Sequence, residues 1–371
     1  MNPIILYGSP MSLYTGRARS YLIKAGLAYR EVPPTSSHFL DTVLPKAGGR
    51  RSLPTIELPD GTVIRDGVAI VDHFEAARGH PSSPTSPKQR IVSRLFDAIG
   101  AEGLLRPAMH YRWNFDAENF EFLRFHFKTV FPEGRVPAAD DRMQFIRDVV
   151  NPSWGLWPEA IETIEALYTQ LLDKLNAHFA QHPYLLGGRP SVGDFGMMAP
   201  LYGHLGRDPA PRLVMQTRAV RVFRWVERMN RPEPDIGEFD DYGDAFLAND
   251  EIPATLVAVL KHLAIDYVPE TRAACACINA WLAEQDDLPE GTTAARGVGD
   301  ATFDLEGIPV TAMAQPFRFH VLKRVQDEFE ALAEPERSDV AALLDACDMT
   351  AVLDLKLTRG IGRANNLEVW L

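Results

Sequence analysis

Residues Ile4–Tyr21 have the sequence IILYGSPMSLYTGRARSY, and this stretch decides the fold. The apolar run Ile4–Tyr7 is typical of a short buried strand, and the Gly-Ser-Pro that follows ends it. From Tyr14 onward, apolar residues recur at helical spacing as far as Ala25, and Gly26 marks the end of the helix. The sequence therefore predicts a strand, a tight loop and a helix, in that order.

Ser12 falls in this loop, immediately ahead of the predicted helix. The first amides of a helix have no internal partner, and the helix dipole places partial positive charge there, which stabilises an anion. A hydroxyl at this point can donate a hydrogen bond to a thiolate and lower the pKa of the thiol. Serine is also a favoured helix N-cap, so a purely structural role for Ser12 is the alternative.

A second stretch, residues 51–70, has the sequence RSLPTIELPDGTVIRDGVAI. Two short strands joined by Pro59-Asp60-Gly61 predict a hairpin, and a helix is expected over Val68–Ala77. Pro54 stands at the entry of the first strand, where a proline is tolerated or marks a cis bond. A cis bond would turn the backbone of Leu53 outward, free to pair with an extended peptide.

This order of elements, over about the first 80 residues, resembles the thioredoxin-like half of the glutathione transferase superfamily. Ser12 matches the active-site serine of the Ser-type classes. Leu53-Pro54 matches the Val-cis-Pro whose backbone pairs with the cysteinyl part of glutathione. Asp66 and Gly67 match the acidic-Ser pair that grips the γ-glutamyl end, but the usual serine is replaced by Gly67, which offers only a backbone N–H at a helix start.

The resemblance implies a glutathione transferase-like enzyme with glutathione as co-substrate and no metal. Ser12 would stabilise the glutathione thiolate, which then attacks an electrophilic carbon in a neighbouring apolar pocket. We expect Leu13, Met109 and Trp113 to line that pocket. Arg51 is a candidate partner for a substrate carboxylate, although a solvated basic loop would look the same.

Three other hydroxyls compete with Ser12, namely those of Tyr7, Ser9 and Tyr14. Tyr7 occupies the position of the tyrosine in the Tyr-type classes, although a packed strand aromatic is the simpler interpretation. In the helical half, Met109 and Trp113 belong to an aromatic cluster that could equally be core. On a helix, the residues of that cluster cannot all face one pocket.

The chain divides at two Pro/Gly-rich stretches, RGHPSSPTSP at residues 78–87 and the acidic segment at residues 231–244. We expect a thioredoxin-like domain over residues 1–80, an all-helical domain over 88–230, and a mostly helical extension with a β-hairpin over 245–371. Ser191 and Asp194 form a capping box and are expected to be structural. The helices predicted beyond the first domain are 88–109, 117–130, 142–150, 158–180, a helix opened by the capping box with further helices to about residue 229, then 253–265, 269–283, 317–332 and 338–347. The second hairpin spans 301–312.

Composition narrows the classes of function. The 371 residues are 46% hydrophobic and carry a net charge of −12, which argues against nucleic-acid binding. The sequence has neither an apolar run long enough to span a membrane nor an evident secretory signal. Three cysteines do not make a disulfide framework, which is typical of a reducing compartment. A cytoplasmic location is therefore expected. The Cys275-Ala276-Cys277 spacing does not fit a zinc site, and Gly360-Ile361-Gly362 lacks the context of a dinucleotide site.

The resemblance also implies a homodimer, because superfamily members pair the thioredoxin-like half of one chain with the helical half of another. The extension could cover that surface. The expected partners are glutathione and a small hydrophobic electrophile. A binding protein that keeps the scaffold without the chemistry is the alternative function, motivated by Gly67 and by the extension.

Overall fold

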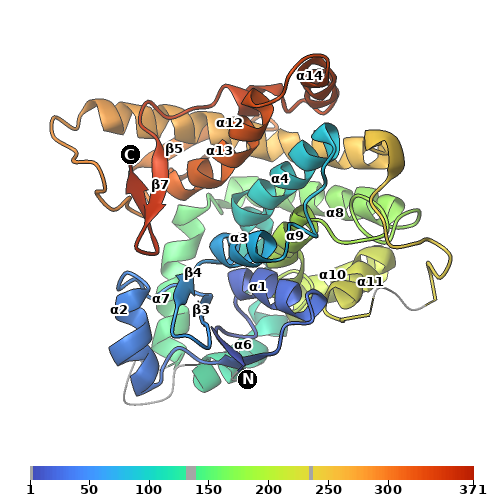
Figure 1. The fold of residues 1–371 in the computed structure, drawn as a ribbon. Helices are drawn as coiled ribbons and strands as arrows, with labels where there is room; N and C mark the ends of the chain where they lie inside the picture. The colour runs from blue at the N-terminus through green and yellow to red at the C-terminus, as the bar shows by residue number, and fades with distance from the viewer. Residues whose placement is uncertain (1–2, 131–138, 234–236) are drawn as a thin grey trace.

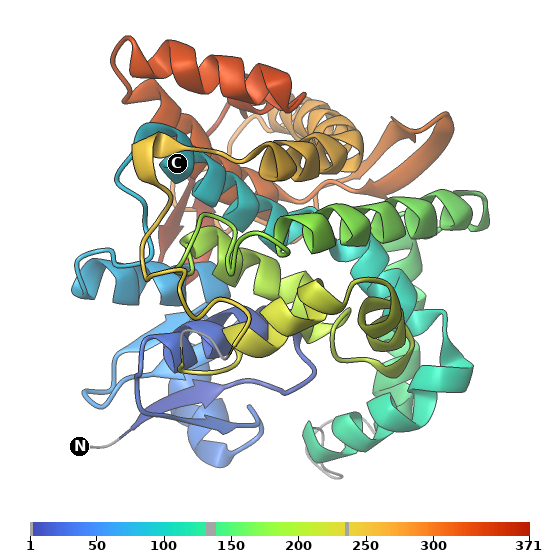
Figure 2. The same ribbon diagram turned by 90° about the vertical axis from the view of Figure 1, so that its right-hand side faces the viewer.

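The computed structural model describes residues 3–130, 139–233 and 237–371. Three parts of the chain are stacked on one another (Figures 1 and 2). The N-terminal sheet domain lies at the bottom of Figure 1, the central helices lie beside and above it, and the C-terminal extension lies across the top. One continuous apolar core runs through all three parts, so the extension is packed against the rest of the chain and is not a separate body.

The N-terminal domain has a four-stranded sheet of order β2-β1-β3-β4. Strands β1 and β2 are parallel, and the other two pairs are antiparallel, which is the mixed sheet of the thioredoxin-like fold expected from the sequence. Residues alternate along β1, so Leu6 faces the main core while Tyr7 packs with Phe39 in a small cluster on the opposite face. The elements are β1 (Ile4–Tyr7), α1 (Leu13–Lys24), β2 (Tyr29–Val32), η1 (Phe39–Val43), α2 (Leu44–Lys46), β3 (Thr55–Glu57), β4 (Val63–Arg65) and α3 (Gly67–Ala77).

The central part is all helical, as predicted, with α9 at its middle. Ser191 and Asp194 form the predicted capping box at the start of α9, and Asp194 also accepts hydrogen bonds from the Leu185 N–H (3.0 Å) and the Trp225 indole (3.0 Å). The elements are α4 (Pro87–Glu102), α5 (Leu105–Trp113), α6 (Asp116–Val130), α7 (Ala139–Ser153), η2 (Pro158–Ala160), α8 (Ile161–His178), α9 (Val192–Gly203), α10 (Pro209–Arg218) and α11 (Val220–Met229).

The prediction of a single helix over residues 88–109 was wrong, because the helix is interrupted at Gly103, between α4 and α5. A Cβ at Gly103 would lie 2.8 Å from the Tyr267 ring of the extension, so only glycine allows this approach. Tyr267, the residue that requires this break, is more than 160 positions away in the sequence. No local sequence pattern therefore reveals the break.

The extension begins with one long helix, α12, not the two helices predicted over residues 253–265 and 269–283. Pro269 removes one hydrogen bond inside α12, at a cost of about 3 kcal/mol, but buried residues on both sides, including Leu263 and Ala274, hold the helix against the core. The predicted hairpin at residues 301–312 is confirmed as β5 and β6. The elements are η3 (Ala248–Asp250), α12 (Ala254–Ala283), β5 (Asp300–Leu305), β6 (Ile308–Met313), α13 (Pro316–Glu330), α14 (Glu336–Ala346), η4 (Thr350–Leu353), β7 (Ile361–Ala364) and β8 (Leu367–Trp370).

Helix α13 lies along α4 and reaches the start of α3. Val321 is buried in a cluster that joins the three helices, with Phe317 packed against its edge. The other members of this cluster are Val68, Ala98 and Ala101. The extension therefore covers a face shared by the thioredoxin-like domain and the helical domain.

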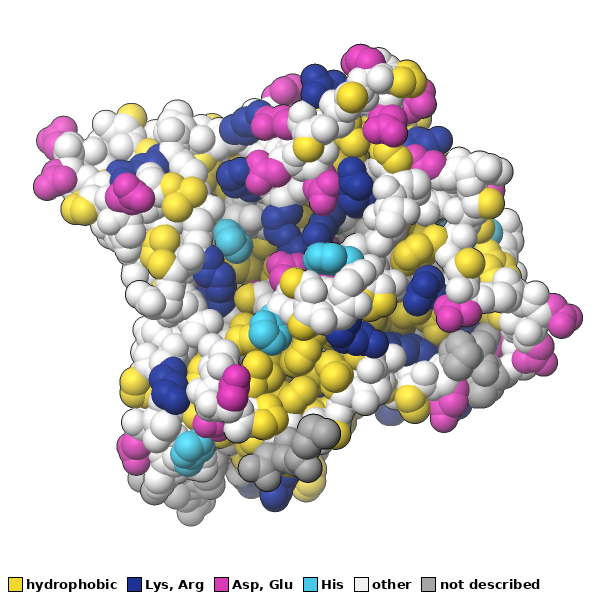
Figure 3. Space-filling view, viewed as in Figure 1, with side chains coloured by type: hydrophobic (Ala, Val, Ile, Leu, Met, Phe, Trp, Pro, Cys, Tyr) yellow, Lys and Arg dark blue, Asp and Glu magenta, His cyan; other side chains and the backbone are white. Residues whose placement is uncertain are grey.

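A partly buried ion-pair network joins α3, α4 and α13 to α1. Asp97 of α4 pairs with Arg17 of α1 (3.0 Å) and with Arg324 of α13 (2.8 Å). Arg324 also pairs with Asp72 of α3. In Figure 3, charged and histidine side chains surround a hollow in the middle of this face, between α3 and the extension.

The hairpin of β7 and β8 was missed by the sequence analysis, and it packs on the free edge of the N-terminal sheet. Asn366 at its turn donates to the Val63 C=O (2.9 Å) and accepts from the Arg65 N–H (3.1 Å). Glu368 of β8 accepts two hydrogen bonds from the Arg65 guanidinium (2.7 and 2.9 Å). The end of the chain is thus fixed to strand β4.

Within the described ranges, none of the helices combines the length and apolar character needed to cross a membrane. Cys275 and Cys347 are buried and Cys277 is half-buried, and all three are free thiols. Across residues 3–130, 139–233 and 237–371, no cluster of three or more His, Cys, Asp or Glu side chains is arranged to hold a metal ion.

Candidate functional site

Ser12 occupies the N-cap of α1, at the point where the loop after β1 turns into the helix. Its hydroxyl oxygen accepts a hydrogen bond from the Thr15 N–H (3.3 Å), and its own N–H donates to the Ser9 C=O (3.0 Å). The side chain is only half-buried. A hydroxyl has two acceptor lone pairs and one donor proton, so capping uses the oxygen and leaves the O–H available. The capping role and a thiolate-binding role are therefore compatible.

The Leu53-Pro54 loop lies at the same end of the sheet as the Ser12 loop. Tyr7 at the end of β1 is paired with Thr55 at the start of β3, so the loops beyond these two residues are neighbours. The Leu53–Pro54 bond is cis, as expected. In the part of the chain that the structure describes, neither the N–H nor the C=O of Leu53 takes part in a hydrogen bond, which leaves this backbone able to pair with an extended peptide.

The start of α3 is the third part of the site, after the Ser12 loop and the Leu53-Pro54 loop. Asp66 has φ 84°, and its N–H donates to the Pro54 C=O (2.9 Å). One carboxylate oxygen of Asp66 caps α3 by accepting from the Val68 N–H (2.8 Å) and the Ala69 N–H (3.4 Å). The second oxygen has no partner among the described residues. Asp66 is therefore partly engaged in capping and partly free.

Gly67, the first residue of α3, stands where the family pattern has serine, and it has little room for a side chain. A Cβ here would lie 3.2 Å from both the Arg17 Cδ and the Tyr14 C=O. Arg17 is buried and held by Asp97, so it has little freedom to move away. The loss of the serine hydroxyl is thus linked to a close approach between α1 and α3.

The two arginines before Leu53 behave differently. Arg50 donates to the Ala294 C=O (3.0 Å) and to Glu368 (3.3 Å), so it is bound to the extension. Arg51 is exposed and makes no hydrogen bond or ion pair with any described residue. Arg51 is the one of the two that remains available to a substrate carboxylate.

The three rival hydroxyls are placed less favourably than that of Ser12. Tyr7 faces the α2 side of the sheet, donates to Glu57 (2.9 Å), and has its pKa raised by burial and by this carboxylate. Ser9 is buried and its oxygen accepts from the Met11 N–H (3.4 Å). Burial, with the nearby charge of Glu102, raises the pKa of Tyr14 well above its ordinary value.

The three residues expected to line an electrophile pocket, Leu13, Met109 and Trp113, all lie in the main core. Met109 is 9% exposed and Trp113 packs edge-on against Phe127 (6.0 Å between ring centroids). Of the same cluster, Tyr111 stacks on Phe115 at 5.0 Å. Their role in substrate binding stays a prediction.

Glu102, at the end of α4, was not singled out by the sequence analysis. It is 4% exposed, and its Oε2 has no hydrogen-bond partner among the described residues. Burial raises the pKa of this carboxyl to about 7, against the lowering effect of Arg318. Its charge also acts on Tyr14 in the first turn of α1. A lone glutamate before a glycine carries no signal of this environment, which is created by packing of the extension.

The fold and the site together define a protein in which a thioredoxin-like domain, with a serine at the start of α1 and a cis-proline loop opposite, is joined to a helical domain. Comparison with known families agrees with this. Residues 6–82 match the family described as "Glutathione S-transferase, N-terminal domain". Residues 6–82 are thus identified as a glutathione S-transferase N-terminal domain. No curated protein matched the chain.

Solved structures with detectable similarity include a glutathione transferase, GSTFuA3, from Phanerochaete chrysosporium (16% identity, 63% of this chain and 98% of that chain, TM-score 0.44). Another is the β-etherase LigF from Sphingobium sp. strain SYK-6 (17% identity, 64% of this chain and 99% of that chain, TM-score 0.42). A third is a glutathione S-transferase from Methylobacterium radiotolerans in complex with glutathione sulfonate (16% identity, 68% of this chain and 100% of that chain, TM-score 0.36).

Proposed function

We propose that this protein is a glutathione S-transferase-like enzyme, which binds glutathione beside the start of α1 and activates its thiol for attack on an electrophilic small molecule. One observation carries the proposal. No described residue accepts the O–H of the half-buried Ser12 at the N-terminus of α1, and none pairs with the backbone of Leu53 in the neighbouring loop.

The residues around this point suit the parts of the tripeptide. An ordinary thiol has a pKa of about 8.5, and a hydrogen-bond donor at a helix N-terminus lowers it by stabilising the thiolate. Ser12 supplies that donor, and the Leu53 backbone pairs with the cysteinyl residue. The free oxygen of Asp66 and the Gly67 N–H would receive the amine and carboxylate of the γ-glutamyl end. Arg51 is the candidate for the glycyl carboxylate.

The reaction then needs no nucleophile from the protein, because the glutathione sulfur itself forms the new bond to carbon. The sulfur loses its proton to solvent before the attack, and the leaving group or the electrophile's new anionic centre takes up the charge. We place the electrophile against Leu13, Met109 and Trp113. Small rearrangements of these side chains would be required, since all three are buried.

Titration calorimetry with glutathione and conjugation assays over a panel of electrophiles test this function directly. We expect glutathione binding at millimolar or lower concentration, turnover with at least one electrophile, and a loss of turnover in Ser12→Ala. Turnover at the wild-type rate in Ser12→Ala would remove Ser12 from the mechanism.

A glutathione-binding protein without transferase chemistry is the second candidate. It is favoured by Gly67, which cannot supply the usual serine hydroxyl, and by the burial of the predicted electrophile pocket. Binding of glutathione with no conjugation of any electrophile in the panel would support this alternative.

We further propose that the chain works as a monomer, in place of the homodimer implied by resemblance. Pairing would join the thioredoxin-like half of one chain to the helical half of another, and α13 already covers neighbouring faces of α3 and α4 in this chain. The three free thiols fit a reducing compartment such as the cytoplasm.

A further inference from the structure

Arg296 belongs to the loop of the extension that joins α12 to β5, and its guanidinium lies over the Trp154 ring of the helical domain, 5.4 Å from the ring centroid. Trp154 is buried, whereas Arg296 is exposed. Across the described ranges, the Arg296 side chain forms no hydrogen bond or ion pair with another residue. The ring therefore supports the cation through a cation–π contact and leaves its N–H donors available.

The backbone on either side of Arg296 is fixed. The Ala294 N–H donates to a backbone C=O of β8 (2.8 Å), and the Ala294 C=O accepts from the guanidinium of Arg50 (3.0 Å). On the other side, the Val298 N–H donates to a backbone C=O just after β6 (3.1 Å). Since Arg50 shortly precedes the Leu53-Pro54 loop, these bonds hold Arg296 close to the proposed glutathione site.

The charge of Arg296 acts on two groups of that site. Burial and the charge of Glu102 raise the pKa of Tyr14, and Arg296 acts in the opposite direction. Burial raises the pKa of Glu102 to about 7, while Arg318 and Arg296 oppose this rise. Tyr14 stands in the first turn of α1, two residues after Ser12. Arg296 therefore lies near the end of the site at which the thiol would be activated.

No described acidic side chain is bonded to Arg296. Glu102 is 4% exposed, and its Oε2 is buried without a hydrogen-bond partner among the described residues. The phenol of Tyr14 stays neutral because its pKa is raised, and it too forms no side-chain hydrogen bond within the described ranges. An unpaired guanidinium and an unpaired phenol in the same part of a site suit a carboxylate, which accepts hydrogen bonds from both.

We propose that Arg296 determines the specificity of the proposed transferase for its second substrate, and that this substrate is an electrophile carrying a carboxylate. The guanidinium would bind the carboxylate, and Tyr14 would donate a further hydrogen bond to it. Leu13, one of the residues against which we placed the electrophile, directly precedes Tyr14. The inference rests on the proposed function and names the chemical class of its electrophile.

Conjugation of 4-chloro-3,5-dinitrobenzoate, compared with the neutral 4-chloro-3,5-dinitrobenzamide, tests this role. In both reactions the glutathione thiolate forms an S–C bond at the carbon that bears chlorine, chloride leaves with the bonding electron pair, and the thiol proton passes to solvent. Each enzymatic rate is divided by the rate with glutathione alone, because the two ring substituents activate the ring differently. We expect the acceleration to be at least about tenfold larger for the benzoate, which corresponds to one charge-assisted hydrogen bond.

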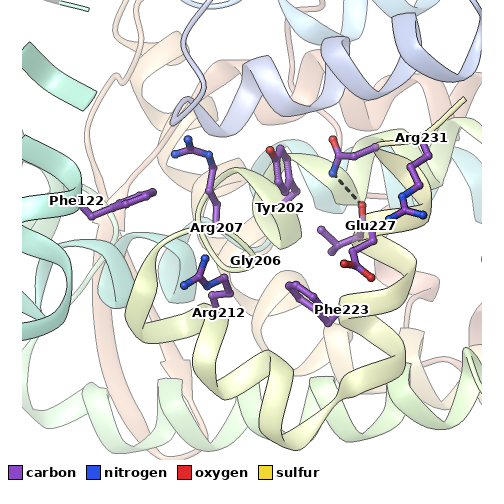
Figure 4. Close-up of a pocket in the computed structure, with 10 residues that line it drawn as sticks. Phe122, Tyr202, Gly206, Arg207, Arg212, Phe223, Glu227 and Arg231 are labelled. Carbon is purple, nitrogen blue, oxygen red and sulfur yellow. Dashed lines mark hydrogen bonds between the residues drawn. The ribbon is translucent and has the colours of Figure 1, made fainter. Parts of the chain in front are cut away.

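Arg296→Ala should raise the KM for the benzoate about tenfold and leave the KM for the benzamide and for glutathione near their wild-type values. This variant should fold normally because Arg296 is exposed. Arg212→Ala is the matched control, since its loss changes the net charge equally. Arg212 is an exposed arginine of α10 that lines a separate hollow on the helical domain, between α6, α10 and α11 (Figure 4).

Titration calorimetry with unreactive analogues separates this inference from the proposed function. The analogue 3,5-dinitrobenzoate has no chlorine to lose, so it binds without reacting. We expect the wild type to bind it about tenfold more tightly than 3,5-dinitrobenzamide, with or without glutathione, and Arg296→Ala to lose this preference. Such a preference in the absence of any conjugation would support the role of Arg296 and remove the transferase function.

Three results would overturn the inference and leave the transferase function in place. The first is equal acceleration of the benzoate and the benzamide by the wild type. The second is the same KM for the benzoate in Arg296→Ala as in Arg212→Ala. The third is a raised KM for glutathione in Arg296→Ala with either electrophile, which would assign Arg296 to a carboxylate of the tripeptide.

Discussion

The Ser12 hydroxyl oxygen accepts a hydrogen bond from the Thr15 N–H over 3.3 Å, so the side chain proposed to hold the glutathione thiolate is also the cap of α1. Replacing Ser12 by alanine removes both roles at once. Loss of the cap should lower the free energy of unfolding by about 1 kcal/mol. Loss of the donor should reduce kcat/KM for conjugation and move its pH dependence upward, because the thiol of bound glutathione would ionise at higher pH.

Ser12→Asp separates the two roles, since aspartate caps a helix well but offers a negative charge where a thiolate would lie. We expect Ser12→Asp to keep the wild-type stability in urea unfolding and to lose conjugation. If Ser12→Asp conjugates glutathione as well as the wild type does, Ser12 serves only as a cap.

Local sequence signals predicted the N-terminal domain because each of its elements is specified by nearby residues. The apolar run of β1 and the Pro-Asp-Gly turn are short-range patterns, and so is the Ser191–Asp194 capping box that starts α9 in the helical domain. The candidate site could be predicted for the same reason, since Ser12, Leu53 and Asp66 stand at ends of these elements. The family match over residues 6–82 covers the same region.

The missed features depend on contacts between distant parts of the chain. Strands β7 and β8 meet at Asn365 and Asn366, which both have positive φ, and an Asn-Asn pair between alternating residues was the available signal for this hairpin. The environment of Glu102 and the break at Gly103 arise only when the extension packs on α4. No window of neighbouring residues contains that information.

Glu368 attaches the hairpin of β7 and β8 to the N-terminal sheet. Replacing Glu368 should therefore lower the free energy of unfolding. Burial alone would raise the pKa of Glu368, but Arg65 and Arg363 hold it below its ordinary value. In Glu368→Ala, the buried guanidinium of Arg65 would lose its carboxylate, which typically costs about 3–5 kcal/mol. Urea unfolding should show this loss, whereas Glu290→Ala should change stability by less than about 0.5 kcal/mol, because Glu290 is exposed and pairs with no described residue. A loss in Glu368→Ala no larger than that of the control would mean that the hairpin contributes little.

Restoring the family's serine at position 67 should destabilise the fold. The added Cβ would press on the Tyr14 carbonyl and on Arg17, which is held by Asp97, and such overpacking costs about 1–3 kcal/mol. Thermal or urea unfolding of Gly67→Ser measures this, with Ala69→Ser in the same helix as the control. Tighter glutathione binding by Gly67→Ser at unchanged stability would show that α1 and α3 can move apart.

Sedimentation equilibrium should give the mass of a single chain, 41.4 kDa, at micromolar concentration. The reason is that Phe317 and Val321 of α13 pack against Val68 and its neighbours, where surfaces of the two halves would otherwise be open to a partner. A mass near twice this value, independent of concentration, would show that pairing uses a surface the extension leaves free.

The contribution of Glu102 to stability should fall as the pH rises towards neutrality. Burial raises the pKa of Glu102 from 4.5 to about 7, so the folded state holds the proton more tightly than the unfolded chain does. The contribution of Glu102 to the free energy of unfolding therefore decreases between about pH 4.5 and 7, by on the order of 3 kcal/mol in total. Glu102→Gln keeps a neutral group of the same shape and should be free of this decrease.

Urea unfolding of the wild type and of Glu102→Gln at pH 5, 6, 7 and 8 measures the effect. Other buried groups, including Asp266 and His178, also titrate differently in the folded state, but they are present in both proteins and largely cancel in the difference. The variant should gain stability relative to the wild type as the pH rises, and most of the gain should be complete near pH 8. Parallel stability curves for the two proteins would mean that the Glu102 carboxyl is solvated or paired in the folded state, which contradicts its burial against the extension.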